Sequence, residues 1–309
     1  MISVVLPVYN EEENLRPLHE ELSGVMDEFE EEHEIVFVDD GSTDGSYEVL
    51  KELSEGDENV RVVRFKKNFG QSAALQAGFD HVQGERVVTL DSDMQNDPKD
   101  IPRLLEKLEE GYDCVSGWRH DRSDPLRKRF FSRLASMLQR PFLGKEVHDY
   151  GCTLKAYRKE AVDALDLKGE MHRYIPPLLR WKGYSVAEVK VNHRERRHGE
   201  TKYGLSRLLK GFLDMLNVWF WQKFSKRPLH VFGTLGVLIS GIGVVMGGFS
   251  LYLWIFENID LSDHFLPTVS LFFFLIGIQL FTSGLIADVV LKNYYEAKDQ
   301  DVYNVETVI

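Results

Sequence analysis

The sequence predicts an α/β fold, with a mostly parallel, doubly wound sheet followed by two transmembrane helices. Short runs rich in Val and Ile alternate with helical stretches through the first part of the chain. Strands that alternate with helices form a mostly parallel sheet with helices on both faces. Two later stretches are almost free of charge, and each exceeds the roughly 20 residues needed to cross a bilayer. The chain therefore divides into a globular part and a membrane part.

Five strands, with helices between them, are expected in the globular part. The first helix is the clearest, because Asn10 and Glu13 have the spacing of a capping box. The same helix carries one apolar stripe, as expected for a helix that covers a sheet. The stripe consists of Leu15, Leu18, Leu22, Val25, Met26 and Phe29. The strands are expected at residues 2–7, 34–40, 60–65, 86–91 and 113–117.

Residues 229–256 and 266–291 are predicted to be transmembrane helices. The alternative, a pair of helices buried in a soluble core, would show a polar stripe that these stretches lack until Asp288. Lys and Arg flank the pair on its outer sides, whereas the connector between the two stretches is acidic. Cytoplasmic flanks carry the excess of positive charge, so we expect a multi-pass protein of the cell membrane with both termini in the cytoplasm.

Composition limits the partners that this chain can have. The formal net charge of −12 counts against a nucleic-acid partner, because such binding relies on Lys and Arg that neutralise phosphates. The two cysteines, Cys114 and Cys152, are too few for a disulfide framework and fit a reducing compartment. A G-x-x-x-G pattern from Gly243 to Gly247 indicates a face for helix packing, and the sequence leaves homo-oligomer formation through the transmembrane helices open.

Polar segments follow four of the expected strands. Ligands of open parallel sheets bind beyond the carboxyl ends of the strands, so these loops are expected to converge on one site. No G-x-G-x-x-G turn follows the first strand, and no G-x-x-x-x-G-K-[ST] motif occurs, which argues against dinucleotide oxidoreductases and P-loop enzymes. The four loops read PVYNEEEN, DDGSTDGS, KKNFGQSAA and DSDMQNDP.

The last of these loops carries two acids one residue apart. Residues i and i+2 of an extended backbone point to the same side, so Asp91 and Asp93 are expected side by side, with Gln95 next in the row. Paired carboxylates with an amide suit Mg²⁺ or Mn²⁺, which complete their coordination with water and phosphate oxygens. For the triplet alone, a helix cap followed by a solvated turn is the competing interpretation.

Five motifs, in this order and spacing, resemble family-2 glycosyltransferases of the GT-A fold. Within that family the chain looks like the polyprenyl-phosphate (dolichyl-phosphate) glycosyltransferase branch. The resemblance runs from residue 2 to about residue 205 and continues more loosely through the two hydrophobic stretches. It implies a nucleotide-sugar donor and a polyprenyl-phosphate acceptor. The motifs are VVLPVYNEEENL, IVFVDDGSTDGS, NFGQSAALQAGF, VVTLDSDMQNDP and GETKYG.

The resemblance also implies roles for individual residues on the donor side. Asp91 and Asp93, with Gln95, would hold Mg²⁺ or Mn²⁺ against the donor diphosphate and so neutralise the departing nucleoside diphosphate. For Asp39, capping of the following helix is the alternative role. The implied nucleotide-sugar contacts are Pro7, Tyr9, Glu11, Asp39, Asp40, Asn68, Gly70, Asp91 and Ser92.

The acceptor side follows from the chemistry of a lipid phosphate. A phosphate monoester is already largely ionised at neutral pH, so it needs positive charge near the donor rather than a general base. Two basic segments, GWRHDRSDPLRKRFFSR and HRERRHGETKYG, offer that charge, although some of their side chains could instead contact anionic lipid headgroups. By resemblance, the acceptor phosphate would be held by Arg119, by Arg127 or Lys128, and by Arg196 and Lys202. Asp91, Asp93, Arg119 and Lys202 are the residues expected to carry catalysis.

The resulting hypothesis is a cytoplasm-facing, metal-dependent enzyme that transfers one sugar to a polyprenyl phosphate with inversion. UDP-glucose is the favoured donor and GDP-mannose the alternative. A processive polysaccharide synthase is a further alternative, but Pro177 replaces the Gln of the Q-x-x-R-W element that ends here in Arg180 and Trp181. The expected organisation is a catalytic domain at 1–204, amphipathic juxtamembrane helices at 205–228, transmembrane helices at 229–256 and 266–291, an external loop at 257–265 and a cytoplasmic tail at 292–309.

Overall fold

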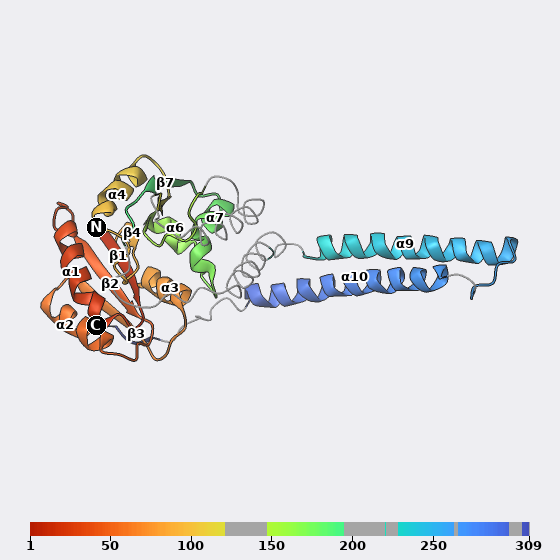
Figure 1. The fold of residues 1–309 in the computed structure, drawn as a ribbon, viewed down its shortest axis with the longest axis horizontal. Helices are drawn as coiled ribbons and strands as arrows, with labels where there is room; N and C mark the ends of the chain where they lie inside the picture. The colour runs from red at the N-terminus through yellow and green to blue at the C-terminus, as the bar shows by residue number, and fades with distance from the viewer. Residues whose placement is uncertain (121–146, 195–219, 221–227, 263–264, 297–304, 309) are drawn as a thin grey trace. The chain divides into compact units, whose positions relative to one another are not determined.

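The computed structural model describes residues 1–120, 147–194, 220, 228–262, 265–296 and 305–308 (Figure 1). The chain forms two compact units. One comprises Met1–Leu216 and Asp301–Ile309, and the other comprises Asn217–Gln300. The amphipathic segment expected at residues 205–228 lies almost wholly outside the described residues, so its helices stay a prediction.

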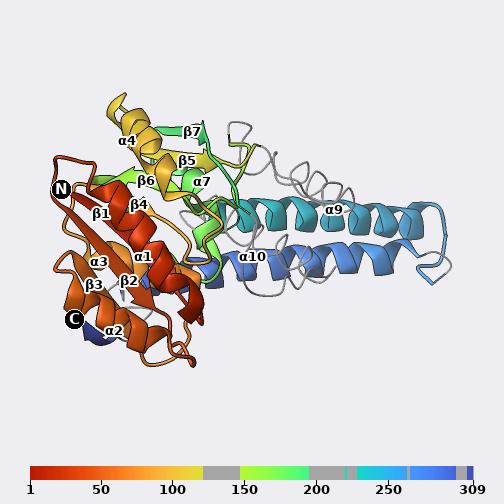
Figure 2. The ribbon, with the colours of Figure 1, turned by 60° about the vertical axis from the view of Figure 1, so that its left-hand side comes forward.

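The first unit is built on one eight-stranded sheet with the strand order β7-β5-β6-β4-β1-β2-β3-β8 (Figure 2). All five strands predicted from the sequence are present, as β1 to β5. Three further strands are not predicted from the sequence: β6 is inserted between β4 and β5, and β7 and β8 form the two edges of the sheet. The strands are β1 (Ile2–Val8), β2 (His33–Asp39), β3 (Val60–Phe65), β4 (Arg86–Thr89), β5 (Cys114–Trp118), β6 (Lys155–Arg158), β7 (Val186–Lys190) and β8 (Val305–Val308).

The sheet is parallel at its centre and mixed toward its ends. β1 pairs in parallel with both β2 and β4, β2 with β3, and β5 with β7. β6 lies antiparallel between β4 and β5, and β8 is antiparallel to β3. The carboxyl ends of β1 to β4 therefore lie at one edge, as the sequence predicts, while β6 runs toward the opposite edge.

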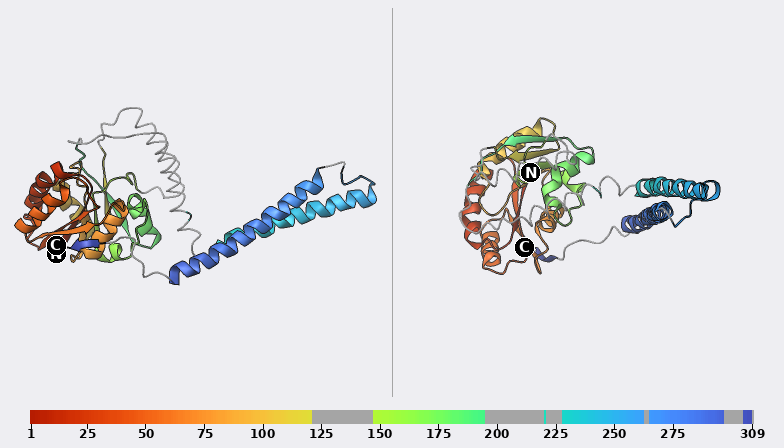
Figure 3. Two further views of the ribbon diagram at one scale, coloured as in Figure 1. Left: turned by 90° about the horizontal axis from the view of Figure 1, so that it is seen from below. Right: turned by 45° about the vertical axis from the view of Figure 1, so that its right-hand side comes forward.

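Helices cover both faces of this sheet (Figure 3). On one face, Leu18 of α1, Leu50 of α2 and Leu104 of α4 belong to the main apolar core together with side chains of β1 and β2. On the other face, α3 packs against β1 and β2. The helices of this unit are α1 (Glu12–Met26), α2 (Ser46–Gly56), α3 (Gln71–His81), α4 (Ile101–Glu109), α6 (Lys159–Asp163) and α7 (Ile175–Trp181), with short 3₁₀ turns η1 (Pro98–Asp100) and η2 (Met171–Tyr174).

The predicted capping box at the start of α1 is wrong. The residue before the helix is Glu11, and its side chain makes no capping hydrogen bond. Asn10 instead adopts a left-handed backbone conformation with φ 56°, which asparagine tolerates better than most residues. Its side-chain oxygen accepts a hydrogen bond from the amide of Thr43 at 2.8 Å. Asn10 thus connects the loop after β1 to the loop after β2. The predicted apolar stripe is buried from Leu15 to Met26, whereas Phe29 lies beyond the end of α1 and is half-buried.

Close packing of α3 on β1 depends on Gly78. An ideal Cβ on Gly78 would lie 2.2 Å from Cγ1 of Val5, a buried β-branched side chain with little rotamer freedom. We expect Gly78→Ala to lower the free energy of unfolding by about 1–3 kcal/mol. Gly24→Ala in α1 is the matched control, because nothing lies within 4 Å of its ideal Cβ.

That control should raise stability by roughly 0.5–1 kcal/mol, since alanine restricts the unfolded chain. Thermal melting of the two purified variants beside the unchanged protein measures both effects. Shifts of opposite sign are expected. A Gly78→Ala variant that melts at or above the temperature of the unchanged protein would contradict this packing.

The second unit contains two long helices, α9 (Pro228–Phe256) and α10 (Leu266–Glu296). Both contain segments long and apolar enough to cross a membrane, and only 17% of each apolar window is buried. Such low burial argues against two core helices of a soluble protein. An ideal Cβ on Gly243 would lie 2.6 Å from the backbone nitrogen of Phe274, so the predicted helix-packing face contacts α10.

The chain returns to the sheet after α10. Val305–Val308 forms β8, which pairs with the edge strand β3 (Figure 2). An uncovered edge strand exposes a row of unpaired backbone groups, so β8 protects that side of β3. The predicted C-terminal tail therefore contains a strand, which its short and mixed sequence does not reveal.

Candidate active site

Hydrogen bonds connect the loops that follow β1, β2, β3 and β4. Asn10 joins the first loop to the second, as described above. The hydroxyl of Ser92, after β4, donates to the carbonyl of Pro7 in β1 at 2.9 Å. Gln71, at the start of α3, donates from its side-chain nitrogen to Oδ1 of Asp91 at 2.8 Å. The predicted convergence of the four loops is confirmed.

Asp40 joins the loop after β2 to the loop after β3. Its carboxylate accepts hydrogen bonds from the amides of Phe69 at 2.7 Å and Gly70 at 2.9 Å. Burial raises the pKa of Asp40, and the two amide hydrogen bonds act in the opposite direction. Gly41, with φ 68°, permits the approach, because an ideal Cβ there would lie 2.4 Å from the carbonyl carbon of Lys67. Asp40 is thus fully engaged in shaping the two loops.

The other residues expected at the nucleotide differ in accessibility. Asp39 is fully buried, accepts the amide of Ser42 at 2.9 Å and lies 3.6 Å from Nε of Arg64. Arg64 stacks over the ring of Tyr47 at 3.8 Å. Tyr9 at the end of β1 is 46% exposed, so its ring is available to a ligand. Of the other predicted contacts, Asn68 and Gly70 lie in the loop before α3, Glu11 accepts a hydrogen bond from Asn14, and Ser92 is buried.

Asp91 lies beyond the end of β4, and the backbone turns at Ser92 and Asp93. β4 ends at Thr89, and Met94 has a left-handed φ of 59°. Oδ1 of Asp93 accepts the amide of Gln95 at 3.1 Å, a local bond typical of aspartate in turns. The expected straight row of Asp91, Asp93 and Gln95 is therefore wrong, because the strand stops before the first acid.

The two carboxylates nevertheless act on each other. Burial and the negative charge of Asp93 raise the pKa of Asp91 to about 6, although Thr153, Lys155 and Arg119 act in the opposite direction. This excess of negative charge fits a divalent cation. Within the described residues, no group of three or more His, Cys, Asp and Glu side chains forms a metal cage. Divalent cations such as Mg²⁺ are commonly held by one or two carboxylates, with water and phosphate oxygens in the other coordination positions.

The segment before and within β6 supports this acidic turn. The hydroxyl of Thr153 accepts a hydrogen bond from Asn96 at 2.9 Å, and its carbonyl accepts one from the hydroxyl of Thr89 at 2.6 Å. Lys155 is buried in β6 and donates to the carbonyl of Cys152, and burial lowers its pKa. Lys155 is not among the residues predicted from the sequence, where its one signal is a charge between the apolar residues Leu154 and Ala156.

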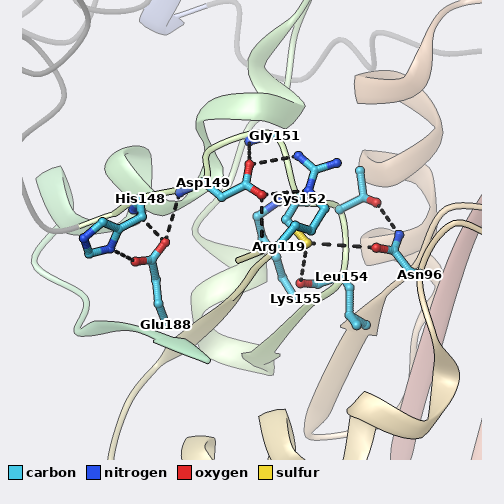
Figure 4. Close-up of polar contacts among 10 residues, drawn as sticks. Asn96, Arg119, His148, Asp149, Gly151, Cys152, Leu154, Lys155 and Glu188 are labelled. Carbon is cyan, nitrogen blue, oxygen red and sulfur yellow. Dashed lines mark hydrogen bonds and ion pairs between the residues drawn. The ribbon is translucent and has the colours of Figure 1, made fainter. Parts of the chain in front are cut away.

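Arg119 lies just after β5 and forms a bidentate ion pair with Asp149 (Figure 4). Its Nε donates to Oδ2 of Asp149 at 2.7 Å, and its Nη2 donates to Oδ1 at 2.8 Å. Both side chains are largely buried, with 12% and 14% exposed. Burial alone would lower the pKa of Arg119, but hydrogen bonding and the charge of Asp149 raise it above its ordinary value.

This side-on pair uses one edge of the guanidinium group. The pair uses Nε and Nη2, and a guanidinium group carries five N–H donors, so the donors on Nη1 form a second edge that can bind an anion. No local pattern in the sequence signals Asp149 as the partner of Arg119, because the two residues are 30 positions apart. The other predicted acceptor residues, Arg127, Lys128, Arg196 and Lys202, lie outside the described residues.

Comparison with known proteins decides the family. The family model for "Glycosyl transferase family 2" matches residues 3–166, which is more than half of the 309 residues. The chain belongs to glycosyl transferase family 2. The family resemblance inferred from its motifs is therefore confirmed.

Relatives of this family-2 glycosyltransferase are similar over both units. The dodecaprenyl-phosphate galacturonate synthase of Rhizobium johnstonii is 37% identical over 303 residues, covering 95% of this chain and 88% of the relative. The undecaprenyl-phosphate 4-deoxy-4-formamido-L-arabinose transferase of Shewanella sediminis is 34% identical over 310 residues, covering 100% and 92%. The similarity thus includes the two long apolar helices.

Solved structures confirm the predicted GT-A-type fold of this glycosyltransferase. The glucosyl-3-phosphoglycerate synthase of Mycobacterium tuberculosis, in complex with Mn²⁺ and UDP-glucose, matches with a TM-score of 0.55 and 22% identity. The match covers 72% of this chain and 78% of the other. At this identity the likeness shows the fold, and the chemistry of the site must be argued from the residues above.

Proposed function

We propose that this chain transfers one sugar from a nucleotide sugar to the phosphate of a polyprenyl lipid. The proposal rests on one observation: acidic and basic side chains follow the carboxyl ends of two parallel strands at one edge of the sheet. Asp91 and Asp93 follow β4, and Arg119, oriented by Asp149, follows β5. An acidic turn suits a cation-bound diphosphate, and an oriented guanidinium suits a phosphate monoester.

The donor would lie against the loops after β1 to β4. We infer that Tyr9 packs against the nucleotide, while Asp40 and Gly41 fix the shape of the loops around it. Asp91 and Asp93 would hold Mg²⁺ or Mn²⁺. When bound, such a cation neutralises negative charge on the leaving nucleoside diphosphate. Gln71 and Thr153 orient the Asp91 carboxylate for this role.

The acceptor would lie against Arg119. A polyprenyl phosphate needs no general base, because its phosphate is already ionised at neutral pH. It does need an oriented cation that offsets repulsion by the donor diphosphate. The names of both relatives specify a polyprenyl phosphate, which supports this class of acceptor. Lys202, Arg196 and either Arg127 or Lys128 stay our candidates for further phosphate contacts.

The sugar is the least constrained part of the proposal. UDP-glucose stays our first candidate donor, with GDP-mannose second, although the two relatives are named for galacturonate and a formamido-arabinose. Attack in line with the departing diphosphate would invert the anomeric centre, so an α-linked donor would give a β-linked product. We also propose that α9 and α10 span the membrane with both termini in the cytoplasm, because basic residues flank the pair.

The full chain in membranes, incubated with labelled nucleotide sugars and undecaprenyl phosphate, tests this function. UDP-glucose, GDP-mannose and UDP-galacturonate form the donor panel. We expect a chloroform-soluble, mild-acid-labile product that carries one sugar and disappears with EDTA. A polymeric product would indicate a processive synthase, and nucleotide binding without turnover would indicate a binding protein; either result would contradict the proposal.

A further inference from the structure

The turn that carries Asp149 is itself held by one carboxylate, that of Glu188 in β7 (Figure 4). Oε1 of Glu188 accepts the amide of His148 at 2.8 Å and the amide of Asp149 at 3.2 Å. Oε2 lies 2.8 Å from Nδ1 of the His148 ring. Both carboxylate oxygens of Glu188 therefore contact two consecutive residues, His148 and Asp149.

The sheet places Glu188 rigidly. β7 pairs in parallel with β5, and Glu188 is in register with Ser116, three residues before Arg119. The Glu188 side chain is only 9% exposed. The His148 ring also stacks on Trp118 at the end of β5, with ring centroids 4.4 Å apart and planes 16° apart. Two neighbouring strands thus hold His148 from two sides.

The position of Asp149 follows from that anchor. With its own amide bonded to Glu188, Asp149 directs both carboxylate oxygens to Arg119 and also accepts the amide of Gly151 at 3.1 Å. Space around the pair is tight, because an ideal Cβ on Gly151 would lie 3.1 Å from Nη2 of Arg119. A shift of the turn would therefore rotate the guanidinium and its open edge.

We propose that Glu188 is a positioning residue for the lipid-phosphate acceptor, acting through Asp149 on Arg119. This inference rests on the proposed function, since it assigns Glu188 a role in binding that acceptor. Glu188 itself would touch neither substrate. Its carboxylate fixes the direction in which the free edge of Arg119 meets an incoming phosphate, and a misplaced guanidinium loses hydrogen bonds to that phosphate.

The test uses Glu188→Gln in the full chain, with Glu106→Gln on the exposed side of α4 as the matched control. Glutamine keeps the size of the side chain but replaces one acceptor oxygen with a donor. We expect the KM for undecaprenyl phosphate to rise about tenfold, with kcat and the KM for the donor within twofold. The control should leave all three values unchanged.

A double-mutant cycle separates positioning from a general structural role. In an Arg119→Ala background, Glu188→Gln should have no further effect on the acceptor KM, because the group it positions is gone. If the two substitutions instead raise the acceptor KM by independent factors that multiply, the inference is overturned. If Glu188→Gln does not fold, as judged by its melting temperature, Glu188→Asp provides the same test with a carboxylate that is too short for all three contacts.

The outcomes also distinguish this inference from the proposed function. If the unchanged protein makes lipid-linked sugar and Glu188→Gln leaves its acceptor KM unchanged, only the role of Glu188 is overturned. If the unchanged protein makes no lipid-linked sugar with any donor, the proposed acceptor fails, and the assignment of Glu188 to that acceptor fails with it.

Discussion

Replacing Asp91 with asparagine is expected to abolish sugar transfer while making the metal-free protein more stable at pH 7. Asparagine keeps the shape and can still accept the hydrogen bond from Gln71, but it lacks the charge needed to hold a divalent cation. We expect kcat to fall at least about 100-fold. Asp93→Ala should lose the lipid-linked product in the same way.

The stability gain follows from the pKa of Asp91. Burial and the charge of Asp93 raise that pKa from 3.8 to about 6 in the folded protein. The folded state therefore resists ionisation of Asp91, and stability from this group is lost as the pH rises from about 4 to about 6. At pH 7 the cost is on the order of 3 kcal/mol, which the neutral asparagine avoids.

Melting temperatures in EDTA between pH 4 and pH 7, measured beside transfer activity, check both parts. The unchanged protein should lose more stability across this range than Asp91→Asn, so the two should differ most at pH 7. Asp260→Asn, an exposed aspartate of the connector between α9 and α10, is the control. An Asp91→Asn protein that is active, or that is less stable than the unchanged protein at pH 7, would contradict the assignment.

Arg119→Ala should have the second large effect on sugar transfer, and the loss should appear in the kinetics of the acceptor. The variant loses the oriented guanidinium, so kcat/KM for undecaprenyl phosphate should fall by about 100- to 1000-fold, while the KM for the donor changes little. Removal of one member of a largely buried ion pair also leaves Asp149 without that partner. We expect a loss of stability of roughly 3 kcal/mol or more.

Two further variants separate charge from geometry. Arg119→Lys keeps the positive charge but cannot make the two parallel hydrogen bonds to Asp149, so most of the activity loss should persist. The double variant Arg119→Ala, Asp149→Asn also removes the negative charge that Arg119 balanced, and it should recover stability without activity. Steady-state kinetics and thermal melting distinguish these results. Full activity in Arg119→Lys would show that orientation by Asp149 is unimportant.

Much of this site could be predicted because it depends on local sequence. Apolar runs of β-branched residues identify β1 to β5, and the rule that ligands bind beyond the carboxyl ends of strands leads from them to Asp91 and Asp93. Burial and the charge of Asp93 raise the pKa of Asp91. The expected extended geometry is wrong because β4 ends at Thr89, and no local pattern signals where a short strand stops.

Other features depend on residues far apart in the chain. The partner of Arg119 is 30 residues away, and Glu188 is a further 39 residues beyond Asp149. These contacts arise because β5, β6 and β7 are neighbours in the sheet, an arrangement that short, mixed strands do not reveal. Asn10 illustrates the same limit: its spacing indicates a helix cap, but Thr43 of the neighbouring loop binds its side chain instead.

The most direct test of the account is a crystal structure of the full chain with Mn²⁺ and a nucleoside diphosphate, in which anomalous scattering locates the manganese. We predict one strong peak between the carboxylates of Asp91 and Asp93, with the diphosphate on its solvent side and the open edge of Arg119 facing the same region. Manganese and diphosphate bound away from these two carboxylates would contradict the assignment of the donor site.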